Sequence, residues 1–463
     1  MIKNFKKILL KESTTIKKAA RMMDEAGAKI VLVCSSSGKL EGVLSFGDLR
    51  RSLLEGHADS DKIKDIYNRR PITANKGDND RRIKALSLSK LSTTGGIIQV
   101  PILDKHRRPI DVAIIDTDGK LSYLTTLAKS TEKRVEKILV TGGAGYLGSV
   151  LVRKLLNSGY KVKVLDNLSF GKESLSKIWA HKGFDLVVGD VLHIDEVVEA
   201  AKDVDAVVHL AAIVGDEASS ANPTLAISDN TLATINLAHT CKKFQINRLV
   251  FTSTCSVYGA SESENLLAET SPLIPVSLYA QSKIESEIEL LRLSDQNFSP
   301  TVLRLSTLFG WSHRPRFDLV VNFFTLLASQ GKGIPVNGGD QWRPFLHVRD
   351  AARAIEMVLQ SPIKSISGEI FNVGSNNSNF TINEIAETIK KLSKDVVIKN
   401  LNSVGDKRNY RVSFSKINRV LDFHTEIGIE EGILEMNRNI KKSDINNLKK
   451  MAFNSPGLLS SLQ

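Results

Sequence analysis

The amino-acid sequence predicts the α/β fold class, with a doubly wound parallel sheet in its larger part. A glycine-rich run, TGGAGYLG at 141–148, separates an apolar strand pattern from a helix pattern. Strand and helix patterns then alternate to about residue 376, as a parallel sheet covered on both faces requires. The first 130 residues instead repeat a shorter helix–strand–turn–strand unit. We therefore expect a module at 1–128, a linker at 129–136 and a larger domain at 137–463.

The N-terminal module contains a weak internal repeat. Residues 15–28 have the spacing of an amphipathic helix, and 29–34 and 40–45 are strands separated by a polar turn. The same order recurs further along, with a helix pattern at 80–93 and extended runs at 97–104 and from 110 onward. A repeat of one such unit predicts two copies that pack against each other.

Positive charge is concentrated in this module. Residues 1–130 hold 25 of the 63 basic and 15 of the 51 acidic residues, and so carry +10 of the net +12. The excess suggests an anionic ligand, and a solvated basic face explains it equally well. Nucleic acid is not the expected partner, because the region lacks a recognition motif and interleaved aromatic residues.

Several classes of protein are disfavoured by composition. No run of about 18 apolar residues occurs, which argues against a membrane-spanning helix. The first apolar segment is too short for a signal peptide and lacks a small-residue cleavage site. Cys34, Cys241 and Cys255 are far apart and have no metal-ligand spacing. We expect a cytoplasmic protein without a bound metal.

The glycine-rich run predicts a dinucleotide site. Its first glycine permits a tight turn, the second lets the backbone approach a pyrophosphate, and the third allows the helix to pack closely on the strand. The N-terminus of the helix that begins at residue 146 would stabilise the phosphate charge. The residues expected at the pyrophosphate are Gly142, Gly145, Tyr146, Leu147 and Gly148.

An acidic residue stands where such a site needs one. Asp166 ends the next predicted strand, where its carboxylate would bind the adenosine ribose and repel a 2′-phosphate. Asn167 follows rather than an arginine, so NAD is favoured over NADP. The other residues expected in this cleft end later strands: Asp190, Val191, Leu210, Ala211 and Ala212.

A tyrosine and a lysine form the candidate catalytic pair. Tyr279 and Lys283 are four residues apart, so they share one face of a helix. A phenol with a pKa near 10 is a poor base at neutral pH, but a fixed ammonium beside it stabilises the phenolate. The strand that precedes this pair ends in STCSVYG at 253–259, which supplies hydroxyl groups.

These motifs resemble the extended short-chain dehydrogenase/reductase family, specifically its nucleotide-sugar epimerases and dehydratases. The segments STCSVYG, YAQSK at 279–283, RPFLHVRD at 343–350 and FNVG at 371–374 follow the glycine run in family order. The resemblance implies a Rossmann-type sheet with NAD, a small C-terminal substrate lobe and a nucleotide-sugar substrate. It implies that Tyr279 is the acid/base and that Lys283 binds the nicotinamide ribose. It also implies that the Thr254 hydroxyl forms a hydrogen bond with the sugar's reacting oxygen. The substrate residues that it implies are Thr254, Ser256, Thr307, Arg343 and Arg411.

One departure from the family pattern narrows the chemistry. Dehydratases of this family place an Asp–Glu pair after the threonine, whereas this chain has Cys255 and Ser256. Water elimination is therefore disfavoured, and an epimerase is the expected activity. A nucleotide-sugar 4-ketoreductase is the alternative, and a non-catalytic NAD-binding sensor is a third interpretation from another class.

The N-terminal repeat resembles a tandem CBS module. The segment GVLSFGDLRRS at 42–52 carries the resemblance, which implies that Ser45 and Asp48 hold the ribose of an adenine nucleotide. The second copy departs from the pattern at Arg107 and Asp111. The module is expected to be either regulatory or structural. Both resemblances imply a homodimer or larger homo-oligomer, with Ile284, Ile288 and Leu291 as candidate contacts.

Overall fold

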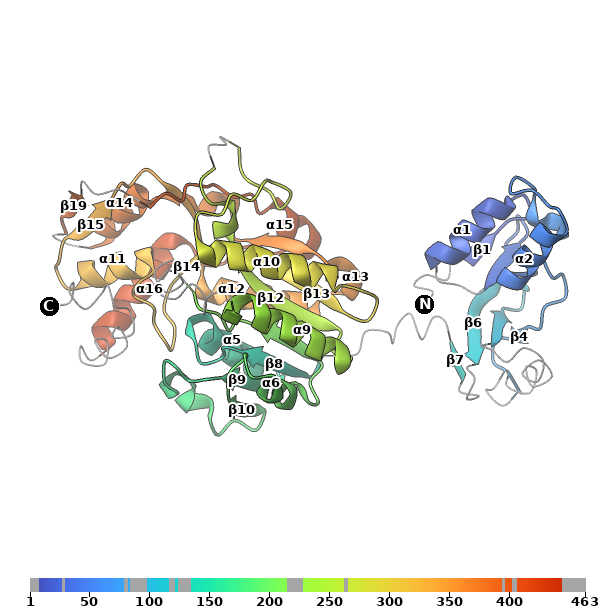
Figure 1. Ribbon diagram of the computed structural model, residues 1–463, viewed down its shortest axis with the longest axis horizontal. Helices are drawn as coiled ribbons and strands as arrows, with labels where there is room; N and C mark the ends of the chain where they lie inside the picture. Colours follow the sequence, from blue (N-terminus) through green and yellow to red (C-terminus); the bar gives the residue numbers. More distant parts are fainter. Residues whose placement is uncertain are drawn as a thin grey trace. The chain divides into compact units, whose positions relative to one another are not determined.

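The computed structural model describes residues 8–26, 30–78, 82–83, 98–115, 121–123, 135–214, 228–261, 265–393, 396–401 and 406–443. The chain divides into two compact units, Met1–Lys133 and Arg134–Gln463 (Figure 1). Most of the helix predicted at 80–93 and most of the linker predicted at 129–136 lie outside the described residues. Among the described residues, none of the helices is long and apolar enough to cross a membrane.

The first unit contains two small sheets that are built alike. Its elements are β1 (Leu9–Leu10), α1 (Ile16–Ala26), β2 (Ile30–Cys34), β3 (Leu40–Ser45), α2 (Phe46–Leu54), the 3-10 turn η2 (Ile63–Asp65), β4 (Ala74–Asn75), β5 (Ile98–Leu103), β6 (Pro109–Ile115) and β7 (Leu121–Tyr123). In one sheet β1 runs parallel to β2, which pairs antiparallel with β3. In the other, β4, β5 and β6 repeat these two pairings, and β7 extends the sheet.

The second unit begins with a seven-stranded sheet and the helices that cover it. The elements are β8 (Lys137–Thr141), α5 (Tyr146–Asn157), β9 (Lys161–Asp166), η3 (Glu173–Ile178), β10 (Phe184–Val188), α6 (Ile194–Ala201), β11 (Ala206–His209), η4 (Ser228–Leu232), α9 (Ala233–Lys243), β12 (Arg248–Thr254), η5 (Cys255–Tyr258), α10 (Leu278–Arg292), β13 (Ser299–Leu305), α12 (Val348–Gln360), α13 (Ile363–Ile366) and β17 (Ile370–Val373).

The order of the strands reverses direction near the middle of the sheet. The strands run in the order β10-β9-β8-β11-β12-β13-β17, and all of the pairings are parallel. The chain builds outward from β8 to β10 and then returns to add β11 on the other side of β8. Ligands of such sheets bind at this reversal, beyond the carboxyl ends of the strands.

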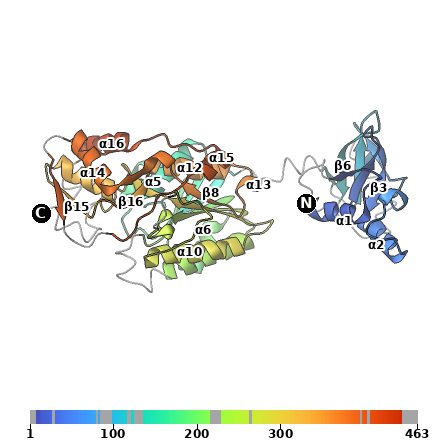
Figure 2. The ribbon, with the colours of Figure 1, turned by 90° about the horizontal axis from the view of Figure 1, so that it is seen from above.

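Two apolar layers hold the helices on opposite faces of the sheet. Successive strand residues point to opposite faces, so Val250 packs with residues of α5 and α12 while Leu249 and Phe251 pack with residues of α6 and α9. Figure 2 shows α10 on one side of the sheet and α12 on the other. This three-layer arrangement confirms the predicted fold class.

A smaller lobe follows at the carboxyl side of the sheet. Its elements are β14 (Thr307–Phe309), α11 (Val320–Ser329), β15 (Ile334–Asn337), β16 (Trp342–His347), η6 (Asn376–Ser378), β18 (Asn379–Thr381), α14 (Ile382–Leu392), β19 (Ile398–Leu401) and α16 (Ile429–Lys442). The helix α15 (Ser415–Leu421) instead packs against β17 of the large sheet. A separate core that includes Phe309, Phe324 and Ile433 joins α11, α14 and α16, which gather at one end of the unit (Figure 1).

Candidate active site

The glycine turn between β8 and α5 is packed so tightly that it excludes side chains. Gly142 has φ +73°, and a Cβ there would lie 2.8 Å from the backbone nitrogen of Ala211. A Cβ at Gly148 would lie 2.1 Å from the Gly142 carbonyl oxygen. Gly145 caps the helix, and its own Cβ would come within 3.2 Å of the same oxygen. The three glycines therefore allow the turn, the start of α5 and the segment at Ala211 to pack against one another.

The first residues of α5 contribute main chain rather than side chains to this site. The Tyr146 hydroxyl donates to the Gly310 carbonyl oxygen at 2.7 Å, which ties α5 to the smaller lobe. Leu147 is 9% exposed and belongs to the sheet's apolar core. The expected contacts of Tyr146 and Leu147 with the cofactor are thus limited to their N–H groups.

Asp166 lies at the end of β9, with its carboxylate held in place by the backbone. Its two oxygens accept from the N–H groups of Ala144 and Leu168, each at 2.9 Å. Burial raises the pKa of Asp166 and Asp190 adds to this, while the two hydrogen bonds oppose it. A carboxylate has about four acceptor positions, so two remain for ribose hydroxyl groups.

Asn167 and Asp190, which follow β9 and β10, are joined by a hydrogen bond. The Asn167 amide donates to the Asp190 carboxylate at 2.9 Å, and the Leu192 N–H donates to its other oxygen at 2.9 Å. Val191, by contrast, is 9% exposed and packs in the core on the α6 and α9 face. Asn167 and Asp190 thus lie near Asp166, whereas the Val191 side chain is mostly buried in the core.

The segment after β11 packs against the glycine turn. Leu210, Ala211 and Ala212 are half-buried, and the Ala211 N–H donates to the Thr141 hydroxyl at 3.3 Å. Beneath them, His209 is fully buried between two hydroxyl groups, those of Thr141 at 2.7 Å and Thr234 at 3.0 Å. Burial, with a smaller contribution from Lys283, lowers the pKa of His209 to about 3, so the imidazole is neutral.

The residues at this edge of the sheet fit a bound NAD. Side chains at Gly142 and Gly148 would collide with the backbone of the turn and of Ala211, and the Asp166 carboxylate is fixed at the end of β9, where a ribose binds in such folds. Gly142, Gly145 and Gly148 would hold the pyrophosphate, and Asp166 the adenosine ribose. When bound, NAD supplies the acceptance and return of a hydride.

Lys283 points from α10 into the sheet and is 2% exposed. Its Nζ donates to the Thr252 carbonyl oxygen at 3.0 Å and lies 4.5 Å from the Phe251 ring centroid. The Tyr279 ring centroid is 5.9 Å from the same nitrogen. Burial lowers the pKa of Lys283 from 10.5 to about 7, and Glu287 opposes this change. The ammonium is therefore close to the tyrosine and titrates near neutral pH.

Tyr279 and Thr254 come from two elements that pack together. Tyr279 is half-buried in the first turn of α10, whose N-cap is Ser277, and α10 packs against β12 and η5. Thr254 ends β12 and caps η5, where its hydroxyl accepts from the Ser256 N–H at 3.1 Å. The predicted catalytic residues thus lie at the carboxyl edge of the sheet, around the end of β12.

A buried ion pair supports the same helix one turn further along. The Arg304 and Glu287 side chains are each 3% exposed and are joined at 2.6 Å. Glu287 also accepts from the Ser253 hydroxyl, and Arg304 donates to the Tyr258 hydroxyl at 3.0 Å. This pair fixes α10 against β12 and β13, because removing either partner would leave a buried charge unpaired.

The two residues after Thr254 are a thiol and a hydroxyl, and neither is a carboxylate. Cys255 is 1% exposed and its thiol donates to the Arg304 carbonyl oxygen at 3.3 Å. Burial raises the pKa of Cys255, so it is not a nucleophile at neutral pH. The Ser256 hydroxyl lies 3.3 Å from that of Tyr410, a residue that the sequence patterns did not indicate. All three cysteines of the chain are buried free thiols.

Arg343, the predicted diphosphate ligand, is engaged by the protein itself. It is 4% exposed, its Nη2 pairs with Asp406 at 2.9 Å, and its guanidinium carbon lies 5.2 Å from the Tyr410 ring centroid. Its Nη1 donates to the carbonyl oxygens of Trp342 and Arg408. Burial raises the pKa of Asp406, but Arg408 and Arg343 outweigh this and hold it well below its usual range.

The remaining predicted substrate residues lie near this cluster or on the strand beside it. The Arg411 guanidinium carbon is 5.2 Å from the Trp342 ring centroid. Thr307 is half-buried and begins β14, where it pairs with Phe345 of β16. Arg343 and Arg411 are thus brought together by Trp342, and Thr307 lies on the neighbouring strand.

In the first unit, Ser45 and Asp48 bind each other. The Ser45 N–H and hydroxyl donate to the Asp48 carboxylate at 2.8 and 2.6 Å, and the Asp48 N–H donates to the Ser45 hydroxyl at 3.2 Å. This is a capping box at the start of α2, which satisfies N–H groups that the helix cannot pair itself. The pair thus has a structural role that needs no nucleotide.

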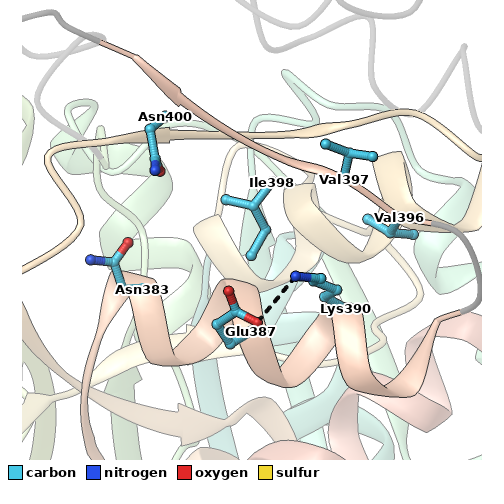
Figure 3. A pocket seen from close by; sticks show the side chains of 7 residues that line it. All are labelled: Asn383, Glu387, Lys390, Val396, Val397, Ile398 and Asn400. Atoms are coloured by element: carbon cyan, nitrogen blue, oxygen red, sulfur yellow. Dashed lines mark ion pairs between the residues drawn. The ribbon is translucent and has the colours of Figure 1, made fainter.

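A surface hollow lies in the smaller lobe, apart from these residues. It has a volume of about 450 Å³ and lies between α14 and the segment that contains β19 (Figure 3). Its lining residues are Asn383, Glu387, Lys390, Val396, Val397, Ile398 and Asn400. Lys390 pairs with Glu387 at 3.6 Å, and the lining contains none of the predicted site residues. We therefore locate the chemistry at the sheet edge.

The glycine cradle, Asp166 and the Tyr279–Lys283 pair define a dinucleotide-dependent enzyme domain. A model of the NAD dependent epimerase/dehydratase family matches residues 138–374, about half of the chain. The chain belongs to this family, and its cofactor is NAD. A CBS domain model matches residues 1–55, which contain the first copy of the N-terminal repeat. These matches confirm the predicted family, cofactor and N-terminal resemblance.

The matches to named relatives cover most of the length of each relative. UDP-glucose 4-epimerase of Bacillus subtilis is 29% identical over 64% of this chain and 94% of the relative. dTDP-glucose 4,6-dehydratase of Streptomyces niveus is 30% identical over 65% of this chain and 91% of the relative. A solved structure, UDP-glucuronic acid 4-epimerase of Bacillus cereus in complex with UDP-glucuronic acid and NAD, is also similar. It is 26% identical, covers 66% of this chain and 99% of its own, and has a TM-score of 0.60.

Proposed function

We propose that this chain is an NAD-dependent nucleotide-sugar epimerase. It oxidises a sugar hydroxyl to a ketone and re-reduces that ketone on the opposite face. Family membership and the activities printed for the relatives support a nucleotide-sugar substrate. The relatives include both epimerases and a dehydratase, so the choice between these reactions rests on this chain's own residues.

In this proposal three side chains perform the proton chemistry. The Tyr279 phenolate takes the proton of the sugar hydroxyl during oxidation and returns it after re-reduction. Lys283 stabilises the phenolate from within the sheet, where its Nζ is held by the Thr252 carbonyl oxygen. Thr254, at the end of β12, orients the reacting oxygen through its hydroxyl.

The two residues after Thr254 favour epimerisation over dehydration. Cys255 is a buried thiol with a raised pKa, and Ser256 is a buried hydroxyl beside Tyr410. Elimination of water needs an acid and a base near the departing hydroxyl. Neither position supplies a carboxylate, so we infer hydride transfer without loss of water.

A screen of sugar nucleotides tests the proposal. Purified protein is denatured to measure its bound NAD, and native protein is then incubated with UDP-, dTDP-, GDP- and CDP-sugars. We expect NAD near one per chain and interconversion of one epimeric pair without added cofactor. A requirement for added NADPH would instead indicate a 4-ketoreductase.

Three variants connect the activity to the proposed residues. Tyr279→Phe and Thr254→Val should each reduce kcat by about a hundredfold or more, as expected when an acid/base group or its orienting hydroxyl is lost. Cys255→Ser is the matched control and should keep most of the activity, because the buried thiol donates to the Arg304 carbonyl oxygen, a bond that a serine hydroxyl can also make. Unchanged turnover in Tyr279→Phe would refute the mechanism.

We also propose that the first unit binds an adenine nucleotide and that the enzyme is a homodimer or larger. The CBS match at 1–55 supports the nucleotide, and the exposure of Ile288, at 57%, supports a contact on α10; Ile284 and Leu291 are half-buried. AMP and ATP should raise the melting temperature of the full chain. Absence of any shift, or a monomer by light scattering, would contradict these two proposals.

A further inference from the structure

Three hydroxyl groups form a continuous chain that begins at Thr254. The Thr254 hydroxyl donates to the Ser256 Oγ at 3.1 Å, and the Ser256 Oγ lies 3.3 Å from the Tyr410 Oη. Ser256 and Tyr410 are both buried, whereas Thr254, at the end of β12, is half-buried. The chain thus runs from the carboxyl edge of the sheet, where the proposed reaction occurs, into the protein interior.

Backbone hydrogen bonds on two sides fix the inner end of this chain. The Asn409 N–H donates at 3.0 Å to the carbonyl oxygen of Gly259, the residue that ends η5. The Tyr410 N–H donates at 3.3 Å to the Trp342 carbonyl oxygen of β16, and the Tyr410 ring lies in the apolar core. The Tyr410 hydroxyl is therefore held beside Ser256 by main-chain contacts.

Tyr410 keeps its proton at neutral pH. Burial raises the pKa of its phenol, and the guanidinium groups of Arg343 and Arg408 oppose this effect only in part. The hydroxyl therefore serves as a neutral hydrogen-bond donor rather than as a base. The Arg343 guanidinium carbon lies 5.2 Å from the Tyr410 ring centroid, and a cation at that distance polarises the phenol and strengthens its O–H as a donor.

The direction of the hydrogen bonds decides what Thr254 can do. Its Oγ1 accepts from the Ser256 N–H at 3.1 Å, which leaves one acceptor position and one proton. While that proton is donated to the Ser256 Oγ, it is not available to a sugar oxygen. Because hydroxyl protons rotate, donation from Tyr410 to Ser256 lets Ser256 donate to Thr254 in turn. The Thr254 proton is then free to point outward.

We propose that Tyr410 is a positioning residue for Thr254. Its hydroxyl donates to Ser256, Ser256 donates to Thr254, and Thr254 donates to the reacting oxygen of the sugar. No proton is transferred along this chain, because each hydroxyl rotates and keeps its own hydrogen atom. The inference rests on the proposed function, since Thr254 orients the sugar in that reaction.

Two properties of the chain favour this direction. A phenol is more acidic than an aliphatic hydroxyl, so Tyr410 is the stronger donor of the two groups that meet at 3.3 Å. Hydrogen bonds aligned in one direction also strengthen one another in a buried environment. The bond from Thr254 would thus be strongest when the sugar hydroxyl loses its proton to Tyr279 and its oxygen becomes negative.

Infrared spectroscopy tests the direction of the first bond without turnover. The full chain is produced with ring-labelled tyrosine, and the difference between wild type and Tyr410→Phe isolates the C–O stretch of the Tyr410 phenol. The frequency of this band distinguishes a phenol that donates a hydrogen bond from one that accepts. We expect the donor frequency in wild type and its loss in Ser256→Ala. An acceptor frequency, or a band that Ser256→Ala leaves unchanged, would overturn the inference.

Kinetic variants test whether this bond affects the reaction. Tyr410→Phe keeps the ring beside Arg343 and removes only the hydroxyl, and Ser256→Ala removes the middle of the chain. Each should lower kcat by about tenfold, as the loss of one oriented hydrogen bond predicts, and leave KM within about twofold. Ser256→Thr retains a hydroxyl and should restore most of the kcat. Tyr160→Phe removes a tyrosine hydroxyl at the amino end of β9, the opposite edge of the sheet, and is the matched control with unchanged kcat.

The two losses should not add, because both act through the Thr254 hydroxyl. The Ser256→Ala/Tyr410→Phe double variant should be about as slow as Ser256→Ala, and Tyr410→Phe should have no further effect on Thr254→Val. A residue that only stabilised the fold would give additive losses.

Each outcome decides the inference. Non-additive losses of kcat at constant KM support it. Additive losses, an unchanged kcat, or a change confined to KM, which would make Tyr410 a substrate ligand, overturn it. If Ser256→Ala does not fold, Tyr410→Phe in the wild-type and Thr254→Val backgrounds decides. A screen that finds no epimerisation would refute the proposed function, and the infrared result would still accept or reject the hydrogen bond donated by Tyr410.

Discussion

Replacing Lys283 with methionine should stabilise the protein without bound NAD while it abolishes turnover. Lys283 is 2% exposed, and burial lowers its pKa from 10.5 to about 7. In the unfolded chain the ammonium is fully hydrated, so folding below pH 7 must bury a charge. Methionine has a similar length, is apolar and does not incur this cost.

The size of the effect follows from the shift in pKa. A change from 10.5 to about 7 corresponds to roughly 5 kcal/mol at 1.36 kcal/mol per unit. Loss of the hydrogen bond to the Thr252 carbonyl oxygen costs about 1–3 kcal/mol. The net stabilisation below pH 7 is therefore roughly 3 kcal/mol, which raises the Tm of a unit of this size by about 4 °C.

The stability of the wild-type protein should depend on pH because of this shift. Between pH 7 and 10.5 the unfolded chain binds the proton that the folded chain releases, so wild-type stability rises with pH over this window. The advantage of Lys283→Met is therefore full below pH 7 and shrinks to near zero by about pH 9, where the cost remaining in wild type is roughly 2 kcal/mol.

Thermal melting at pH 6 and pH 9 measures this difference, on the transition that NAD shifts. Lys242→Met is the matched control, because Lys242 also donates to a carbonyl oxygen, that of Leu293, but its side chain is 33% exposed. Its effect should stay within about 1 kcal/mol at both pH values. A Lys283→Met protein that melts below wild type at pH 6, or by the same offset at both pH values, would refute the reasoning.

Three further predictions follow from contacts in the second unit. Gly148→Ala should purify without NAD, because its Cβ would lie 2.1 Å from a carbonyl oxygen of the same turn; Gly428→Ala, where a Cβ meets no atom within 4 Å, should retain it. Cys255 should resist thiol labelling in the native protein and react after denaturation, since it is 1% exposed. Arg304→Met should lose about 3–5 kcal/mol in urea unfolding, because Glu287 is left as an unpaired buried charge.

The sequence predicted most of what local patterns determine. Alternation and turn residues predicted the strand at 40–45 with the bounds that β3 has, and the apolar pattern before the glycine run predicted β8. The glycine run and Asp166 predicted the cradle, because turn geometry and the fixed carboxylate are local consequences of those residue types. The nearness of Lys283 to Tyr279 likewise follows from helix spacing.

Contacts between distant segments were beyond the sequence patterns. Asp406, the partner of Arg343, and Tyr410, beside Ser256, come from a segment that pairs with residues far earlier in the chain, at Ala260 and Leu267. Tyr146 was expected to contact the cofactor, and its side chain instead reaches Gly310, 164 residues away in sequence.

The Ser45–Asp48 pair is a different case. A serine followed three residues later by an acidic residue at a helix start is also the pattern of a capping box, and that local role is the one that its contacts show. Here two physical explanations share one sequence pattern: the capping box is seen in the hydrogen bonds, and the nucleotide contact stays a prediction.

Isotope tracking tests the central claim most directly. The nucleotide sugar identified by the screen is prepared with deuterium on the carbon whose configuration changes, and the product is examined by mass spectrometry and NMR. An epimerase returns the same hydride to the same carbon, so we predict the epimer with its deuterium retained and no added cofactor consumed. A product that has lost water, or deuterium replaced by hydrogen at that carbon, would contradict the account.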